Sequence, residues 1–431
     1  MDANALSILA YFLLLIAVIY FFRRNDEVPI LLTIFFLLTG LSRYYAVASG
    51  RVGWVYVAYS RIGIFNLNDK SALTALNYFF LGTAVLSITY MFFKTNIKNT
   101  QRYYFRDTNL YFKDFILQRS NLIIRLFVFF IVLNSILTKV ITGIVALGNS
   151  YFFLFQLAIG GITVLMYLVY ENFNFKTHFY QKLLFLGLLL YSAVLSYNPT
   201  LRFQFLSWLL AVGILITRRY LPAQKARLYL LGGFLVLLLF ALAGVARQKN
   251  LSTLSFEQQV VLAYERAFEK REDANMLDGF MMVLDVYPHH LDFHYGMEHL
   301  EILLRPIPRS WWPDKPVGGY VNKLGLNNYQ TYGTVGISQT LYGSFYGEGG
   351  VVGIVVFCFI YAWLFVRIGR YANRYQSDMR WVIWGLFLAS LIPLLRGGDL
   401  PGIIAFIGMS YWPVFIFIYQ YNQYLKRAGV A

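Results

Sequence analysis

Long apolar runs separated by short polar connections make up most of the chain. A helix that crosses a bilayer needs about 20 mostly apolar residues, because the hydrocarbon layer is about 30 Å thick and each residue adds about 1.5 Å. Eleven segments meet this requirement, so we predict an all-α integral membrane protein with about 11 transmembrane helices. They lie near residues 5–22, 28–48, 71–93, 121–140, 150–170, 181–197, 201–217, 228–245, 345–366, 381–395 and 401–420.

The first and the last two of these segments allow a second interpretation. Residues 5–22 resemble a cleavable signal, but the basic pair Arg23–Arg24 follows the apolar run instead of preceding it, which favours a retained helix. Pro393 and the Gly397–Gly398 pair could make the last two segments a broken or re-entrant pair.

A long polar segment, residues 246–342, separates the eighth predicted helix from the ninth. The chain is therefore expected to have three parts, which are residues 1–245, 246–342 and 343–431. Within the polar segment, Ser255 with Gln258 forms a capping-box pattern, and Asn275 with Asp278 can begin a second short helix that Pro288 stops. A third is predicted over 297–304. Such amphipathic helices would lie on the membrane surface or over a cavity mouth, and they could equally form a lid without chemistry.

Charge decides the direction of the spans. Of the 431 residues, 58% are hydrophobic and 13% are charged, against roughly a quarter charged in soluble domains, and the formal charge is +16. In a soluble protein such a charge would suggest nucleic-acid binding. Here 20 basic residues lie in alternate connections and in the C-terminal tail, where cytoplasmic loops carry their Lys and Arg. This predicts an external N terminus, a cytoplasmic C terminus and no nucleic-acid partner.

A proline-rich run, residues 305–316, carries the most unusual chemistry of the external segment. Its four prolines hold an extended backbone that also bears Arg305, Arg309, Lys315, Trp311 and Trp312. Guanidinium groups match phosphate oxygens, and indole rings suit sugars or lipid headgroups. The run could instead be an interfacial loop with tryptophan anchors.

Three more arginines lie at predicted outer helix ends, namely Arg202, Arg247 and Arg396. A charge at membrane depth costs several kcal/mol, on the order of 3, unless it is paired or hydrated, so each is a candidate for function. A single one would be explained by snorkelling. Because all of them fall on one side, together with Arg305 and Arg309, they suggest a bound polyanion such as a lipid diphosphate.

Candidate bases lie in the same region. Four of the five histidines, His289, His290, His294 and His299, are external, but their spacing matches no recognised zinc site, and the single Cys358 lies in an apolar run. We therefore predict no metal. His299 is the first choice for a general base, with Glu348 and Asp399 as alternatives, and Glu301 and Asp314 could do the same work. Glu348 could also be an ordinary acidic residue near a helix start.

The run Pro308-Arg309-x-x-Trp312-Pro313-x-Lys315-Pro316 resembles the motif of the Wzy-type oligosaccharide repeat-unit polymerases of O-antigen and exopolysaccharide synthesis. The glycine-rich stretch 343–353 and the Arg396-Gly397-Gly398-Asp399 turn are similar to later segments of that family, and Arg202 with Gly213 fits its arginine-to-glycine spacing. Two departures stand out: a second arginine-to-glycine copy is not found, and Ser344 replaces an expected acidic residue.

The resemblance implies a glycosyltransferase of the bacterial inner membrane that polymerises polyprenyl-diphosphate-linked repeat units at the outer face. It implies no metal or other cofactor, a Wzz-like chain-length regulator and a flippase as partners. An O-antigen ligase, which transfers the glycan to lipid A core, shares this chemistry. A flippase is expected to place polar groups on both sides of the midplane, whereas the unusual charges cluster on one side. A noncatalytic scaffold would leave the arginines unexplained.

Overall fold

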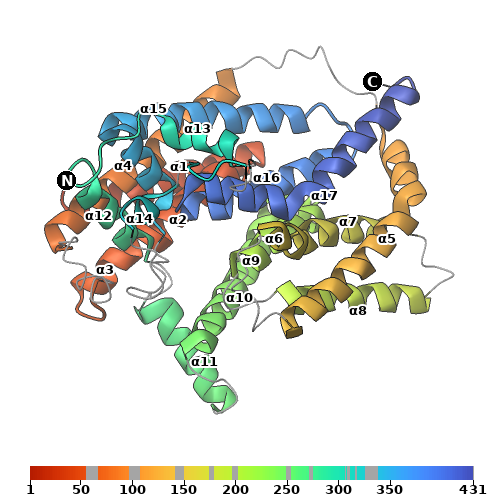
Figure 1. The fold of residues 1–431 in the computed structure, drawn as a ribbon, viewed down its shortest axis with the longest axis horizontal. Coiled ribbons are helices and arrows are strands. Elements are labelled where there is room, and N and C mark those ends of the chain that lie inside the picture. Colours follow the sequence, from red (N-terminus) through yellow and green to blue (C-terminus); the bar gives the residue numbers. More distant parts are fainter. Residues whose placement is uncertain are drawn as a thin grey trace. The chain divides into compact units, whose positions relative to one another are not determined.

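The chain is an all-α integral membrane protein (Figure 1). The computed structural model describes residues 1–54, 67–96, 107–140, 150–173, 179–196, 202–248, 254–270, 275–305, 307, 311–315, 318–325 and 338–430. No strand occurs in these ranges.

The N-terminal helices are α1 (Ala3–Arg24), α2 (Val28–Phe36), the π-helical η1 (Leu37–Leu41), α3 (Ser42–Ala48), α4 (Asp69–Asn96) and α5 (Asn109–Val140). There follow α6 (Ser150–Leu157), α7 (Ile159–Asn172), α8 (Phe179–Ser196), α9 (Arg202–Thr217) and α10 (Pro222–Gln248). The predicted external segment contains α11 (Phe256–Tyr264), the π-helical η5 (Glu265–Lys270), α12 (Met276–Val286), α13 (Met297–Leu304) and α14 (Tyr320–Lys323). The last three helices are α15 (Thr340–Ala372), α16 (Met379–Arg396) and α17 (Leu400–Arg427).

In the part of the chain that the structure describes, each predicted span is mostly helical, although 28–48 is divided among α2, η1 and α3, and 150–170 between α6 and α7. Within the described ranges, nine helical segments are long and apolar enough to cross a membrane. The two remaining predicted spans, 181–197 and 201–217, correspond to shorter apolar helices over Phe179–Leu195 and Phe205–Thr217, so the count of 11 stays a prediction. The last two spans are separate helices: α16 continues through Pro393, and the turn at Gly397–Gly398 falls between α16 and α17.

The helices form two compact units. Unit 1 contains residues 1–98, 221–366 and 393–405, and unit 2 contains residues 99–220, 367–392 and 406–431. The short helices of the external segment therefore belong to unit 1, together with α1 to α4. The predicted three-part division remains a prediction along the sequence, because chain segments from all three parts contribute to unit 1.

Contacts within unit 1 bring predicted outer chain ends together. The Asn77 side-chain amide donates to the Met1 carbonyl at 3.1 Å, and the Tyr45 hydroxyl lies 2.9 Å from Ser7 Oγ. The start of α1, the end of α3 and the start of α4 therefore share one end of the unit. We call this the N-terminal end.

The opposite end of unit 1 carries buried charges that the sequence analysis did not single out. Asp26 pairs with Lys94, and Lys225 donates to Glu27 at 2.9 Å from a fully buried amine. Tyr90 donates to Asp26 at 2.9 Å. Buried ions need such partners because water no longer solvates them. The expectation that unusual charges cluster on one side is therefore wrong for unit 1.

Helix α12 is buried on all sides, which corrects the expectation of an amphipathic surface helix. Asn275, at the N-cap, makes no side-chain capping bond. Asp278 lies in the first turn, but its side chain is buried instead of exposed to solvent. Its carboxylate instead accepts two hydrogen bonds of 2.9 Å from Arg43 of α3, with the two side chains 0% and 1% exposed. The buried pair fixes α12 against the transmembrane helices at the N-terminal end.

Helix α11 follows its prediction more closely. Ser255 and Gln258 form the predicted capping box, in which each side chain accepts from the backbone N–H of the other residue. Phe256, Val261 and Tyr264 are exposed, as an amphipathic helix at a lipid surface requires. A π-helical turn follows over Glu265–Lys270.

Unit 2 is built around one apolar core from α5, α7, α9, α16 and α17. Phe115 of α5 packs at a tilt against Tyr421 of α17, with ring centroids 5.2 Å apart. Phe112 packs edge-on against the same ring, with centroids 5.5 Å apart. Aromatic pairs at such distances add about 0.5–1.5 kcal/mol each beyond the area they bury.

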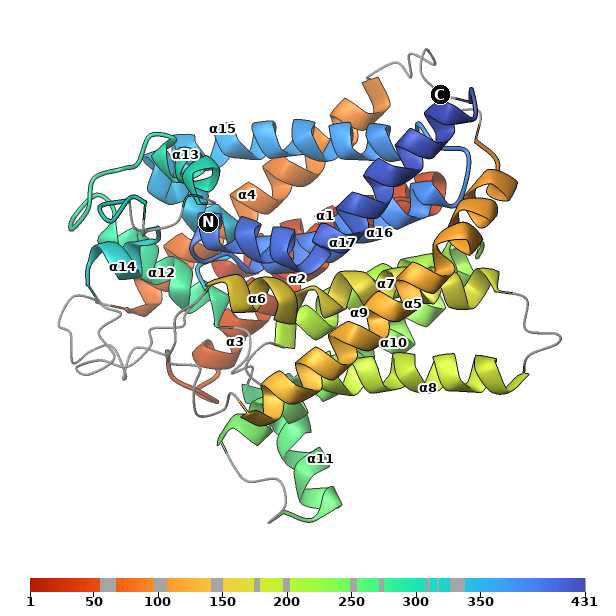
Figure 2. The same cartoon turned by 45° about the vertical axis from the view of Figure 1, so that its right-hand side comes forward.

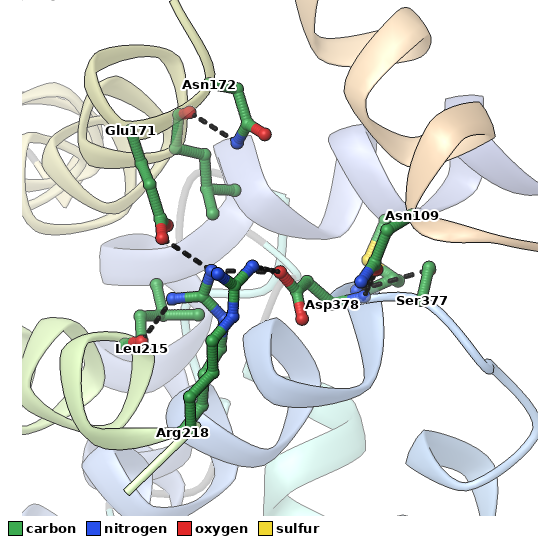
Figure 3. A network of polar contacts seen from close by, with 10 residues as sticks. Asn109, Glu171, Asn172, Leu215, Arg218, Ser377 and Asp378 are labelled. Carbon is green, nitrogen blue, oxygen red and sulfur yellow. Dashed lines mark hydrogen bonds and ion pairs between the residues drawn. The ribbon is translucent and has the colours of Figure 1, made fainter.

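A polar cluster closes one end of unit 2 (Figure 3). The Arg218 guanidinium contacts Glu171 at 2.5 Å and Asp378 at 2.9 Å, and Asn109 accepts from the Asp378 backbone N–H at 2.8 Å. Asp107 accepts from the Tyr421 hydroxyl at 2.9 Å. The connections predicted to be cytoplasmic thus meet at one end of this unit, which supports the predicted alternation of the spans.

Candidate functional site

The predicted bases His299 and Glu348 lie together in unit 1. His299 is on α13, and Glu348 is near the start of α15; Figures 1 and 2 show these two helices side by side. Nδ1 of His299 lies 2.6 Å from Glu348 Oε1. The other carboxylate oxygen accepts from the Gly296 backbone N–H at 2.5 Å, and only 2% of Glu348 is exposed. We call this pair the His–Glu dyad.

A break in α15 gives Glu348 its position. Gly349 and Gly350 interrupt the helical backbone, with Gly350 at φ +64°, a conformation that favours glycine. The carbonyls of Gly347 and Glu348 then accept from the backbone N–H groups of His294 and Tyr295, both at 2.9 Å. These two backbone hydrogen bonds join the loop before α13 to α15.

The His299 ring is held by aromatic neighbours. It stacks on Phe357 with centroids 4.1 Å apart and planes 6° apart, and its Nε2 lies 3.3 Å from the Tyr361 hydroxyl. The side chain remains 21% exposed. With the Nδ1 proton facing Glu348, Nε2 accepts from the Tyr361 hydroxyl. A substrate hydroxyl that displaces this contact can give its proton to Nε2, and the carboxylate stabilises the imidazolium that forms. The arrangement is that of an oriented general base.

Two acids that share one face of α13 extend the site. Glu298 is 3% exposed and accepts from the Leu400 backbone N–H at 3.1 Å. Burial raises the pKa of Glu298 to about 8, although the bond from Leu400 opposes this. Glu301 lies 3.4 Å from the Lys323 amine. Glu298 is therefore mostly protonated at neutral pH and can donate a proton, a role that the sequence analysis did not assign.

The turn between α16 and α17 holds the third predicted base. Asp399 pairs with Arg305 at 3.4 Å, and burial raises the pKa of its carboxyl while the nearby guanidinium opposes the rise. Gly397 has φ +71° and packs against the backbone of Thr340, which leaves no room for a side chain. Asp399 is thus committed to an ion pair, which makes it a weaker candidate for the base than His299.

A second histidine, His294, lies near Glu348, and its backbone N–H donates to the Gly347 carbonyl. The Tyr287 hydroxyl and His294 Nε2 are 2.6 Å apart, and the Lys323 amine is 3.3 Å from the same nitrogen. Burial, reinforced by Lys323, lowers the pKa of His294 to about 4. His294 is therefore neutral at physiological pH and accepts a hydrogen bond there.

The predicted phosphate-binding cations have different environments. The Arg305 side chain is 38% exposed beside Asp399, in a narrow pocket that Glu301 and Pro401 also line. Lys315 is buried and donates to the carbonyls of Arg305 and Ile307, so its amine caps the end of α13, and its contact with a diphosphate stays a prediction.

Other predicted site residues are placed less completely. Arg396 ends α16 directly before the turn, and Arg202 and Arg247 lie in α9 and α10 near helix ends. Arg309 falls outside the described residues. Trp311 is 81% exposed and Trp312 38% exposed, as the predicted contact with glycan or lipid requires.

The described residues contain no group of three or more His, Cys, Asp or Glu that could hold a metal ion. No family model, no curated protein and no solved structure matches the chain.

Glu298→Gln is expected to make the protein more stable at basic pH than the parent protein is. Because the pKa of Glu298 is raised on folding, its protonated carboxyl contributes fully to the free energy of unfolding below the unfolded pKa, about 4.5. This contribution is lost as the pH rises through the folded pKa, about 8. The glutamine amide of the variant cannot ionise, so the variant does not lose this stability at basic pH. Thermal unfolding of both proteins between pH 4 and pH 9, on the order of one-unit steps, measures the difference. Parallel curves over that range would refute the assignment of a neutral Glu298.

Proposed function

We propose that the protein is a glycosyltransferase of the bacterial inner membrane that polymerises polyprenyl-diphosphate-linked oligosaccharide repeat units at the outer face. The observation that carries the proposal is the His–Glu dyad, an oriented base on α13. A partly exposed arginine, Arg305, follows the same helix directly. The resemblance of residues 308–316 to the Wzy-type polymerases supplies the substrate class.

In the proposed reaction, the terminal hydroxyl of one lipid-linked repeat unit attacks the anomeric carbon of the growing chain. His299 Nε2 takes the hydroxyl proton as the new C–O bond forms, and Glu348 stabilises the imidazolium. The bond from the anomeric carbon to the diphosphate breaks, and its electron pair leaves with the lipid diphosphate. The imidazolium then returns its proton to the solvent or to the leaving diphosphate.

Arginine side chains stabilise the leaving group in this proposal. Arg305 can exchange its contact with Asp399 for a phosphate oxygen, since its side chain is partly exposed. Arg396 adjoins the same turn, and Arg309 is in the same proline-rich run as Arg305. A guanidinium aimed at developing charge performs the work of an oxyanion site.

The proposed orientation follows the distribution of basic residues. It places the N terminus and the dyad in the periplasm, and the polar cluster around Arg218 and the C terminus in the cytoplasm. The buried pairs Asp26–Lys94 and Glu27–Lys225 of unit 1 would also lie on the cytoplasmic side. Both carboxylates have a cationic partner, so these pairs hold helix ends together and do not favour a flippase.

Reconstitution tests the proposal directly. The purified protein in liposomes, given only a lipid-linked repeat unit, is expected to produce a ladder of longer lipid-linked chains on a gel, with no loss of product when a metal chelator is present. Transfer only to added lipid A core would identify a ligase instead. Movement of the substrate across the membrane without any bond formation would identify a flippase and reject the proposal.

A further inference from the structure

A groove at the N-terminal end of unit 1 is separate from the His–Glu dyad. It has a volume of about 410 Å³, within the range of sites that hold small ligands, roughly 300–1,000 Å³. Leu37, Leu38 and Leu41 form one wall, and Tyr11 of α1 and Phe268 contribute apolar surface elsewhere. None of its lining residues belongs to α13, α15 or the turn between α16 and α17.

Two π-helical segments shape the groove. Leu37, Leu38 and Leu41 belong to η1, and Phe268 belongs to η5. A π-helical turn widens the helix, and such turns in α-helices frequently mark functional sites. The Ser42 hydroxyl donates to the Leu38 carbonyl at 2.5 Å, which satisfies a backbone group next to the widened turn.

The groove has one apolar end and one charged end. Arg51, which follows α3, lines it and is exposed, and no described carboxylate forms an ion pair with this guanidinium. Leu37 lies 11 residues before Ala48, the last residue of α3, so the apolar end is about 17 Å from the end of the helix. Half of the hydrocarbon layer is about 15 Å thick. The groove thus extends through about one leaflet.

We propose that this groove binds an acyl chain of an anionic phospholipid, with the lipid phosphate at Arg51. Leucine and aromatic side chains suit a hydrocarbon chain, and the guanidinium without a carboxylate partner suits a phosphate. The groove is about as long as one leaflet is thick, which is the length of a phospholipid acyl chain whose headgroup lies at the Arg51 end. The Tyr45 hydroxyl, which bonds to Ser7 and the Ala3 carbonyl, holds α3 against α1 beside the groove and keeps its walls in place. This site does not depend on the proposed catalytic activity.

The test uses phosphatidylglycerol with a spin label near the end of its acyl chain, added to the full-length protein in nanodiscs of phosphatidylcholine. A motionally restricted spectral component is expected. Ser42→Trp and Leu38→Trp fill the groove from one wall and should remove most of that component. Leu190→Trp, at an exposed position of α8, which contributes no residue to the groove, is the matched control and should retain it. Two filling variants are used so that one misfolded protein does not decide the result.

The headgroup contact has its own measurement. Arg51→Gln should lower the preference for phosphatidylglycerol over phosphatidylcholine about fivefold, as expected from about 1 kcal/mol per basic residue near the surface. Absence of a restricted component in the parent protein, or its persistence in both filling variants, would overturn the proposal. Displacement of the labelled lipid by an equimolar amount of a polyprenyl phosphate would also overturn it, because the groove would then belong to the glycan carrier.

Discussion

Replacing His299 with alanine is expected to slow chain growth in liposomes by about 10²- to 10⁴-fold, the usual contribution of a positioned general base. The imidazole is the proposed proton acceptor, and it lies 2.6 Å from the Glu348 carboxylate that orients it. Because the ring acts in the chemical step, the loss should appear in kcat, with a much smaller change in KM. The rate of ladder formation at several substrate concentrations measures both.

Glu348→Gln and His290→Ala complete this experiment. The glutamine keeps the shape of Glu348 but loses the charge that stabilises the imidazolium, so the rate of the variant should also fall. His290 is an exposed histidine of the same segment, and its alanine variant should retain full activity. Full activity in the His299 variant would remove the dyad from the mechanism, whereas chain growth in the parent protein would still support polymerisation.

Replacing Arg43 with methionine is expected to destabilise the protein by about 3–5 kcal/mol, because breaking a buried pair leaves a charge without compensation. The Arg43 guanidinium makes two bonds of 2.9 Å to Asp278 and one of 3.0 Å to the Gly53 carbonyl, with almost no exposed surface. After the substitution, the Asp278 carboxylate would remain buried without its cation. The free energy of unfolding in mixed micelles measures the change.

A double variant separates lost packing from the stranded charge. Arg43→Met combined with Asp278→Leu removes both charges and should recover most of the stability, since apolar replacement of a buried pair is often neutral or stabilising. Arg23→Met, at an exposed arginine in the last turn of α1, is the control and should change stability by less than about 0.5 kcal/mol. Equal stability of the single variant and the parent protein would show that α12 does not depend on this pair.

Helix positions could be predicted because apolar runs of membrane length have few alternatives. Backbone groups in a bilayer must bond within their own segment, so a run such as 28–48 becomes helical whatever its neighbours are. The capping box at Ser255 was equally local and is confirmed. Helix α12 was misjudged, since its pattern is compatible with an amphipathic surface helix and its partner Arg43 lies 235 residues away.

Part of the candidate site could be predicted from the sequence. Scarce charge in an apolar chain drew attention to His299, Glu348 and Asp399, and the structure places the first two in contact. Glu298 could have been found from its spacing of three residues from the candidate Glu301 on the predicted helix over 297–304, since residues so spaced share a face. Lys315 could not, because its role depends on the carbonyls that the end of α13 leaves without partners.

By itself, the sequence determined that this protein is a helical membrane protein and where most of its helices lie. Hydrophobicity and basic charge act locally, so their effects can be read from the sequence whatever the packing of the helices is. Only the tertiary structure decided which polar groups meet: Arg43 with Asp278, Lys225 with Glu27, and His299 with Glu348. These pairs join residues far apart in the chain, and their strength comes from burial, a property that a linear pattern does not record.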